Sequence, residues 1–113
     1  LNNCIVIIDE NKKQLDGTTE DILNPFDIAE KMRAFGFHTT KVKGDDLVAI
    51  DEAIDQCKAV TDQAVCIVLD TIKGQGVKFF EEMDANHSVK FDSEAVQTAT
   101  DQALQKLKVK GRA

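Results

Sequence analysis

Residues 4–8 read Cys-Ile-Val-Ile-Ile and lead directly into the polar segment Asp9-Glu10-Asn11. Five apolar residues in a row, most of them β-branched, predict a strand that is buried on both faces, which is typical of parallel sheets covered by helices. In open α/β sheets, ligands bind beyond the carboxyl ends of the strands. Amide and carbonyl oxygens in that place suit a hard cation such as Mg²⁺. The segment after the strand is therefore the first candidate for a functional site.

The composition indicates one globular domain with an acidic surface. The chain has 113 residues, of which 42% are hydrophobic and 30% charged, as is usual for such a domain. Its 14 basic and 20 acidic residues give a net charge of −6, which disfavours nucleic acid and anionic membranes as partners. Cys4, Cys57 and Cys66 lie within apolar runs and lack the spacing of a zinc site, as expected of free thiols in the cytoplasm.

Strand and helix patterns alternate along the chain. The expected strands span about Cys4–Ile8, Phe37–Val42 and Ala64–Leu69, and the expected helices begin at Asn24-Pro25, Asp46 and Ser93. This order predicts an α/β fold of three layers, in which a parallel sheet with right-handed crossovers is flanked by helices. The last helix carries an inner apolar stripe of Val96, Ala99, Ala103, Leu104 and Leu107. The first strand needs a neighbour on its other side, so we expect a piece of the domain to lie outside this chain.

An ordered series of motifs resembles the transketolase family. The run from Ile5 to Gly17, IVIIDENKKQLDG, resembles the strand and cofactor loop of transketolases. Further resemblances cover nearly the whole chain: Asn24-Pro25-Phe26, Ala34-Phe35-Gly36-Phe37, Gly44-Asp45-Asp46 and Thr71-Ile72-Lys73-Gly74-Gln75-Gly76-Val77. The chain is most similar to the small N-terminal subunit found where bacterial transketolase is split into two polypeptides. The resemblance implies a transferase of the pentose phosphate pathway that uses thiamine diphosphate and Mg²⁺ to move a two-carbon glycolaldehyde unit from a ketose phosphate to an aldose phosphate.

The resemblance also implies roles for individual residues. Asn11 matches the asparagine whose side-chain oxygen binds Mg²⁺, and Lys13 matches the position that offers its backbone carbonyl to the same ion. Leu15 and Ile72 match apolar positions near the cofactor. His87 matches a histidine near the cofactor and substrate, although this chain reads Asn-His-Ser where the family usually reads Trp-His-Gly. From the residues alone, an asparagine such as Asn11 is more often a turn former than a ligand, and an ordinary solvated histidine is the default interpretation of His87.

The family pattern further implies that this chain is incomplete. A metal-binding aspartate of the family lies in a Gly-Asp-Gly motif upstream of the first strand, and a glutamate that activates the cofactor belongs to a separate pyrimidine-binding domain or subunit. We therefore expect residues 1–113 to be a single partial domain, the second half of a diphosphate-binding domain, which is inactive alone and works within a homo- or hetero-oligomer. Two alternatives stay open: a non-catalytic assembly or interface module of the same fold, and a related thiamine-diphosphate enzyme such as 1-deoxyxylulose-5-phosphate synthase.

Overall fold

The computed structural model describes residues 2–110, apart from the side chain of residue 110. The elements within this range are β1 (Ile5–Glu10), β2 (Lys13–Gln14), β3 (Gly17–Thr18), α1 (Thr19–Leu23), α2 (Ile28–Ala34), β4 (His38–Lys43), α3 (Leu47–Lys58), β5 (Val65–Asp70), α4 (Lys78–Glu81) and α5 (Glu94–Lys110). No helix in this range is long and apolar enough to cross a membrane.

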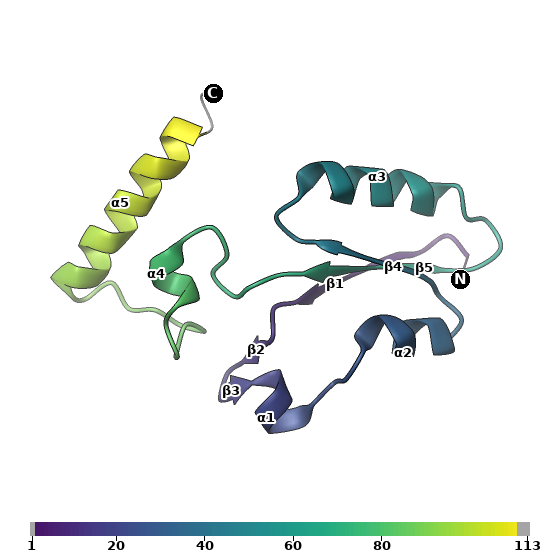
Figure 1. Cartoon of the computed structure of the whole chain (residues 1–113), viewed down its shortest axis with the longest axis horizontal. Coiled ribbons are helices and arrows are strands. Elements are labelled where there is room, and N and C mark those ends of the chain that lie inside the picture. The colour runs from purple at the N-terminus through teal and green to yellow at the C-terminus, as the bar shows by residue number, and fades with distance from the viewer. Residues whose placement is uncertain (1, 111–113) are drawn as a thin grey trace.

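The main sheet has the strand order β1-β5-β4, and both pairings are parallel. Val65 at the start of β5 lies opposite Ile5 on one side and His38 on the other, so the three strands begin and end together. Helices α2 and α3 lie on opposite sides of this sheet (Figure 1). The predicted three-layer α/β fold with a parallel sheet is therefore confirmed.

The central strand β5 supplies the core on both of its faces. Val65 and Ile67 pack with Ala53 and Cys57 of α3, whereas Cys66 and Val68 pack with Ala29 of α2 and with partly buried residues of β1. Ile67, Val68 and Cys66 are fully buried. Burial raises the pKa of the Cys57 and Cys66 thiols, which keeps them protonated as small apolar side chains.

The prediction that the first strand is buried on both faces is wrong for this chain. β1 lies at the edge of the sheet. Its side chains alternate: Val6 and Ile8 pack under α2, whereas Ile5 and Ile7 are 40% and 54% exposed. Ile5 and Ile7 stay exposed because α3, on the face of the sheet opposite α2, covers β5 but does not extend over β1. The strand also continues to Glu10, so the polar residues after the apolar run are still part of it.

The helix expected to begin at Asn24-Pro25 begins later, at Ile28. The Asn24 side-chain oxygen accepts a hydrogen bond from the Phe26 amide at 2.8 Å, and Phe26 has a positive φ of 51°, which no helix accommodates. Asp27 is the N-cap instead, because its carboxylate accepts from the Glu30 amide at 2.9 Å.

The other two expected caps are confirmed, but the last helix packs differently from the prediction. Asp46 caps α3 by accepting from the Ala49 amide, and the Ser93 hydroxyl accepts from the Val96 amide at the start of α5. However, α5 stands beyond α4 and away from the sheet (Figure 1). Its predicted inner stripe is only partly covered, with Leu104 and Leu107 almost half exposed.

The chain is consequently extended for its size. Its radius of gyration is 17.2 Å, whereas a compact chain of this length has about 13 Å. Its accessible surface is 8248 Å², whereas a compact monomer of this mass exposes roughly 6,200 Å². The excess surface includes Ile5 and Ile7 on β1 and the apolar side of α5.

Candidate functional site

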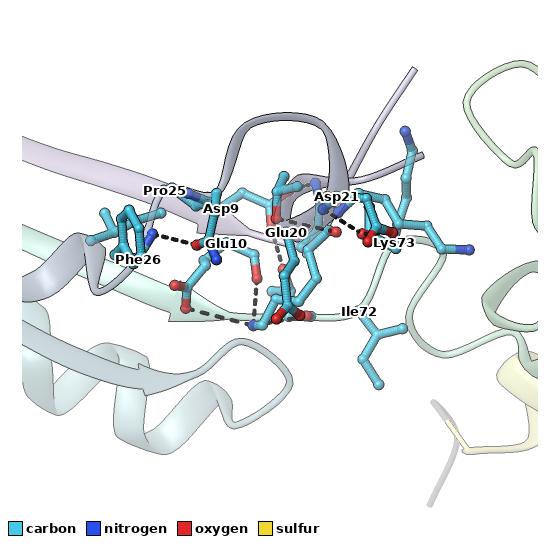
Figure 2. Close-up of a pocket in the computed structure, with 16 residues that line it drawn as sticks. Asp9, Glu10, Glu20, Asp21, Pro25, Phe26, Ile72 and Lys73 are labelled. Carbon is cyan, nitrogen blue, oxygen red and sulfur yellow. Dashed lines mark hydrogen bonds and ion pairs between the residues drawn. The ribbon is translucent and has the colours of Figure 1, made fainter. Parts of the chain in front are cut away.

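A cavity of about 720 Å³ opens beyond the carboxyl ends of β1 and β5. Figure 2 shows its side chains, with Pro25 and Phe26 near one end of the view and Ile72 and Lys73 near the other. The cavity is lined by the end of β1, the segment that leads to α1, the turn before α2 and the loop after β5, that is by Asp9–Lys13, Thr18–Asp21, Asn24–Phe26, Ile28 and Thr71–Lys73. Parallel strands bring these segments together because their carboxyl ends meet at one edge of the sheet.

Asn11 lies at the cavity and shapes the turn after β1. Its side-chain oxygen accepts from the Lys13 amide at 3.1 Å, and its side-chain nitrogen donates to the Asp9 carboxylate at 3.1 Å. An amide oxygen has two lone pairs, so the bond from Lys13 leaves one of them for another partner. The turn-forming role and a ligand role for Asn11 are therefore compatible.

The Asp9 carboxylate is held beside Asn11 by a second donor. The Thr71 hydroxyl, from the loop after β5, donates to the other oxygen of Asp9. These bonds from Thr71 and Asn11 hold the pKa of Asp9 below its usual value, because they favour the ionised form. Thr71 is a site residue that sequence reasoning missed, since its partner is 62 positions away along the chain.

Lys12 is a second missed residue. It has a φ of 65°, and its ammonium donates to the Glu10 carbonyl at 2.7 Å and to the Asp70 carboxylate at the end of β5. The contact with Lys12 lowers the pKa of Asp70. The Glu10 carboxylate pairs at 2.5 Å with Lys41 of β4, so the acidic strand ends are balanced by lysines.

Lys13 lines the cavity, but its ammonium binds outside it, and Leu15 is an exposed residue that does not line the cavity. The Lys13 ammonium donates to the Met83 carbonyl at 2.7 Å, beyond α4, while its backbone pairs with Thr18 in the β2–β3 hairpin. Leu15 is 65% exposed and is absent from the cavity wall. Ile72 lines the cavity and is 54% exposed, so a bound molecule could cover it.

His87 does not line the cavity but contacts a residue that does. Its Nδ1 is 3.2 Å from the Nζ of Lys73, which lines the cavity. The neighbouring Asn86 donates to the carbonyls of Lys73 and Phe80 at 3.0 and 2.8 Å, which ties the loop of His87 to the loop after β5. Sequence reasoning also missed Lys73 and Asn86. For Asn86, the one available signal was its position as a polar residue directly before His87.

The chemistry of this donor set fits part of a Mg²⁺-diphosphate site. Asn11 Oδ1 and the loop carbonyls are hard oxygen donors, and Mg²⁺ is usually held by few protein oxygens together with substrate phosphates. The cavity volume is also in the range of small-molecule sites. However, residues 2–110 contain no group of three or more His, Cys, Asp or Glu side chains that could hold a metal ion by themselves.

These features describe an α/β domain with a candidate ligand site at the carboxyl ends of parallel strands. A family model described as the transketolase thiamine diphosphate binding domain matches residues 1–106, and the chain belongs to this family.

Individual relatives agree with this assignment. The chain is 38% identical over 95 residues to a 6-deoxy-6-sulfo-D-fructose transketolase subunit of Clostridium sp. strain MSTE9, with 83% of this chain and 34% of the relative covered. It is 41% identical over 75 residues to transketolase of Mycobacterium leprae, with 66% of this chain and 11% of the relative covered. Among solved structures, a transketolase variant from Pichia stipitis in complex with fructose 6-phosphate has a TM-score of 0.62 at 22% identity, with 98% of this chain and 20% of that chain covered. The chain thus spans about a third or less of the length of these relatives.

Proposed function

We propose that the chain is a component of a thiamine-diphosphate-dependent transketolase, which transfers a two-carbon glycolaldehyde unit from a ketose phosphate to an aldose phosphate. The observation that supports this best is the position of Asn11 at the cavity beyond β1 and β5, in a member of the thiamine diphosphate binding family. The names of relatives, which include transketolase subunits, agree with it.

In this proposal, Asn11 Oδ1 and the Lys13 carbonyl would hold Mg²⁺ together with the diphosphate of the cofactor. The free lone pair on Asn11 and the oxygen-rich end of β1 support this role. Leu15 and Ile72 cover apolar parts of the cofactor, which would remove their exposed side chains from water. The chemistry that thiamine diphosphate supplies when bound is a nucleophilic carbon for breaking and forming bonds beside a carbonyl group.

We assign His87 the catalytic role of binding a substrate hydroxyl or moving its proton. Lys73 is within hydrogen-bond distance of Nδ1, and a charged lysine can only donate. In this arrangement Nδ1 would be the acceptor, which would leave Nε2 to carry the ring hydrogen and donate it to a substrate hydroxyl.

The proposal includes a partner, because the site is only part of a cofactor site. Residues 1–113 would form the second half of a diphosphate-binding domain, and the partner would supply the remaining metal ligand and the pyrimidine-binding region. Exposed Ile5 and Ile7 and the open edge of β1 support such a partner, since an uncovered strand edge invites another strand. We expect this assembly in the cytoplasm and expect the isolated chain to bind the cofactor weakly.

The test measures cofactor binding and transfer separately. Calorimetric titration with thiamine diphosphate and Mg²⁺ should give weak binding to the chain alone and tight binding to the assembled enzyme, which should transfer glycolaldehyde from xylulose 5-phosphate to ribose 5-phosphate. Asn11→Ala should weaken Mg²⁺-dependent binding, whereas Asn3→Ala, an exposed control at the other end of β1, should not. Unchanged affinity in Asn11→Ala would contradict the ligand role.

A second candidate is a non-catalytic assembly module of the same fold. It is favoured by the engagement of both polar atoms of Asn11 within the loop and by the lack of a three-residue metal cluster in the part of the chain that the structure describes. An assembled complex that binds no cofactor would support it. An assembled complex that binds cofactor without the two-carbon transfer would point instead to a related enzyme such as 1-deoxyxylulose-5-phosphate synthase.

A further inference from the structure

Lys12 occupies an unusual position between the two proposed metal-binding residues. Its φ of 65° lies in the left-handed region, which a residue with a Cβ seldom adopts. Asn11 and Lys13 flank it, so the direction of their oxygens depends on the conformation of its backbone. An interaction that holds the backbone of Lys12 in this conformation therefore also sets the direction of the oxygens of Asn11 and Lys13.

The ammonium of Lys12 is surrounded by oxygens from two strand ends. It donates to the Glu10 carbonyl at 2.7 Å and to the Asp70 carboxylate. The Thr71 carbonyl is 3.4 Å away, and Glu10 Oε2 is 3.6 Å away. Four oxygens around one nitrogen resemble the shell of a bound cation, and charge-assisted bonds of this kind are stronger than neutral ones.

The backbone of Lys12 is anchored as well. Its carbonyl accepts from the Thr19 amide at 2.9 Å, at the start of α1. The side chain thus ties the loop to the end of β5, and the carbonyl ties it to α1. Two anchors on one residue can hold a backbone conformation that would otherwise be disfavoured.

We propose that Lys12 is a positioning residue whose ammonium serves as a built-in cation, clamping the loop between β1 and β2 in the conformation that presents Asn11 Oδ1 and the Lys13 carbonyl to one side. That the presented oxygens bind Mg²⁺ rests on the proposed function, whereas the clamp itself does not. The clamp also occupies the Asp70 and Glu10 oxygens, which would otherwise offer a competing site for a cation.

The test measures amide hydrogen exchange by NMR in the 113-residue chain. In Lys12→Met, protection of the Lys13 and Thr19 amides should fall about tenfold, as expected for the loss of a charge-assisted bond. Protection of the Ile67 amide in the central strand should not change. Lys90→Met, at an exposed lysine outside the cavity, is the matched control and should leave the loop protected. Unchanged loop protection in Lys12→Met, or an equal loss at Ile67, would overturn the clamp.

A salt comparison tests whether the clamp acts as a cation. In Lys12→Ala, ammonium chloride should restore protection of the Lys13 amide, whereas tetramethylammonium chloride at the same ionic strength should not, since it screens charge equally but cannot donate hydrogen bonds. Equal effects of the two salts would refute the cation role. If Lys12→Met fails to fold, Lys12→Gly replaces it, because glycine adopts this φ without strain.

A separate experiment tests whether Lys12 affects cofactor binding. Lys12→Met in the assembled enzyme should weaken Mg²⁺-dependent cofactor binding while Lys90→Met does not. If the assembled wild-type enzyme binds no cofactor, the proposed function fails, and the exchange experiment still decides the clamp.

Discussion

Gly44 lies where β4 ends and touches the segment that holds the candidate site together. Its amide donates to the Asp70 carbonyl at 3.0 Å, and a Cβ added to it would lie 2.1 Å from Cγ2 of Thr71. Two carbon atoms that are not bonded to each other cannot come this close, so in Gly44→Ala the Thr71 side chain must rotate. Rotation would take the Thr71 hydroxyl away from Asp9, to which it donates.

The cost can be estimated from these contacts. Overpacking of a close contact costs about 1–3 kcal/mol, and the loss of a bond to a carboxylate adds to it. We expect the free energy of unfolding of Gly44→Ala to fall by about 2 kcal/mol, a large part of the stability of a small domain. The pKa of Asp9 should rise towards its ordinary value, because the bond from Thr71 is the largest cause of its lowering.

A second substitution makes the test specific. Thr71→Ser removes Cγ2 and keeps the hydroxyl, and the next nearest atoms, at 3.4 and 3.5 Å, are ordinary contacts. Urea denaturation of the double variant should therefore recover most of the loss seen in Gly44→Ala. Gly36→Ala is the control: it has a φ of 87° and no neighbour within 4 Å, so its loss should not respond to Thr71→Ser. A fully stable Gly44→Ala, or no recovery in the double variant, would refute the reasoning.

Three further outcomes are expected. Ile67→Ala removes a fully buried side chain and should lower the free energy of unfolding by about 2–5 kcal/mol in urea denaturation; a smaller loss would mean that the sheet core is not as packed as described. Asp46→Ala removes the N-cap bond to Ala49 and should cost about 1 kcal/mol, with less helix by circular dichroism on heating. The bond from Thr71 holds the pKa of Asp9 below its ordinary value, so the ionised carboxylate stabilises the fold above that ordinary value, and this contribution is lost as the pH falls through the lowered pKa. Asp9→Asn should therefore make stability less dependent on pH below about 4, and an unchanged acid dependence would count against the Thr71 bond.

Features set by a local pattern could be predicted from the sequence. The run Val65–Leu69 is apolar at every position, and it forms the strand that is buried on both faces. Asp46 and Ser93 precede apolar stripes and cap helices as expected. The first strand has the same apolar character, but its burial depends on which elements cover it, and α3 does not cover β1.

Features that depend on distant partners could not be predicted. The later start of α2 follows from the positive φ of Phe26, which no residue pattern indicates. Asn11 was identifiable because a motif surrounds it. Lys12 and Thr71 were not, because their partners Asp70 and Asp9 are 58 and 62 positions away, and only the folded sheet brings these residues together.

The strand order has a consequence for how the chain folds during synthesis. The two outer strands, β1 and β4, both pair with β5, which the ribosome makes last of the three. Until Asp70 has emerged, neither outer strand has its β5 partner in the sheet described here, and for β1 that partner is made about 60 residues later. A premature stop before residue 65 would thus leave β1 and β4 without the strand that joins them, rather than with a smaller version of this sheet, and such chains should depend on chaperones that bind apolar segments.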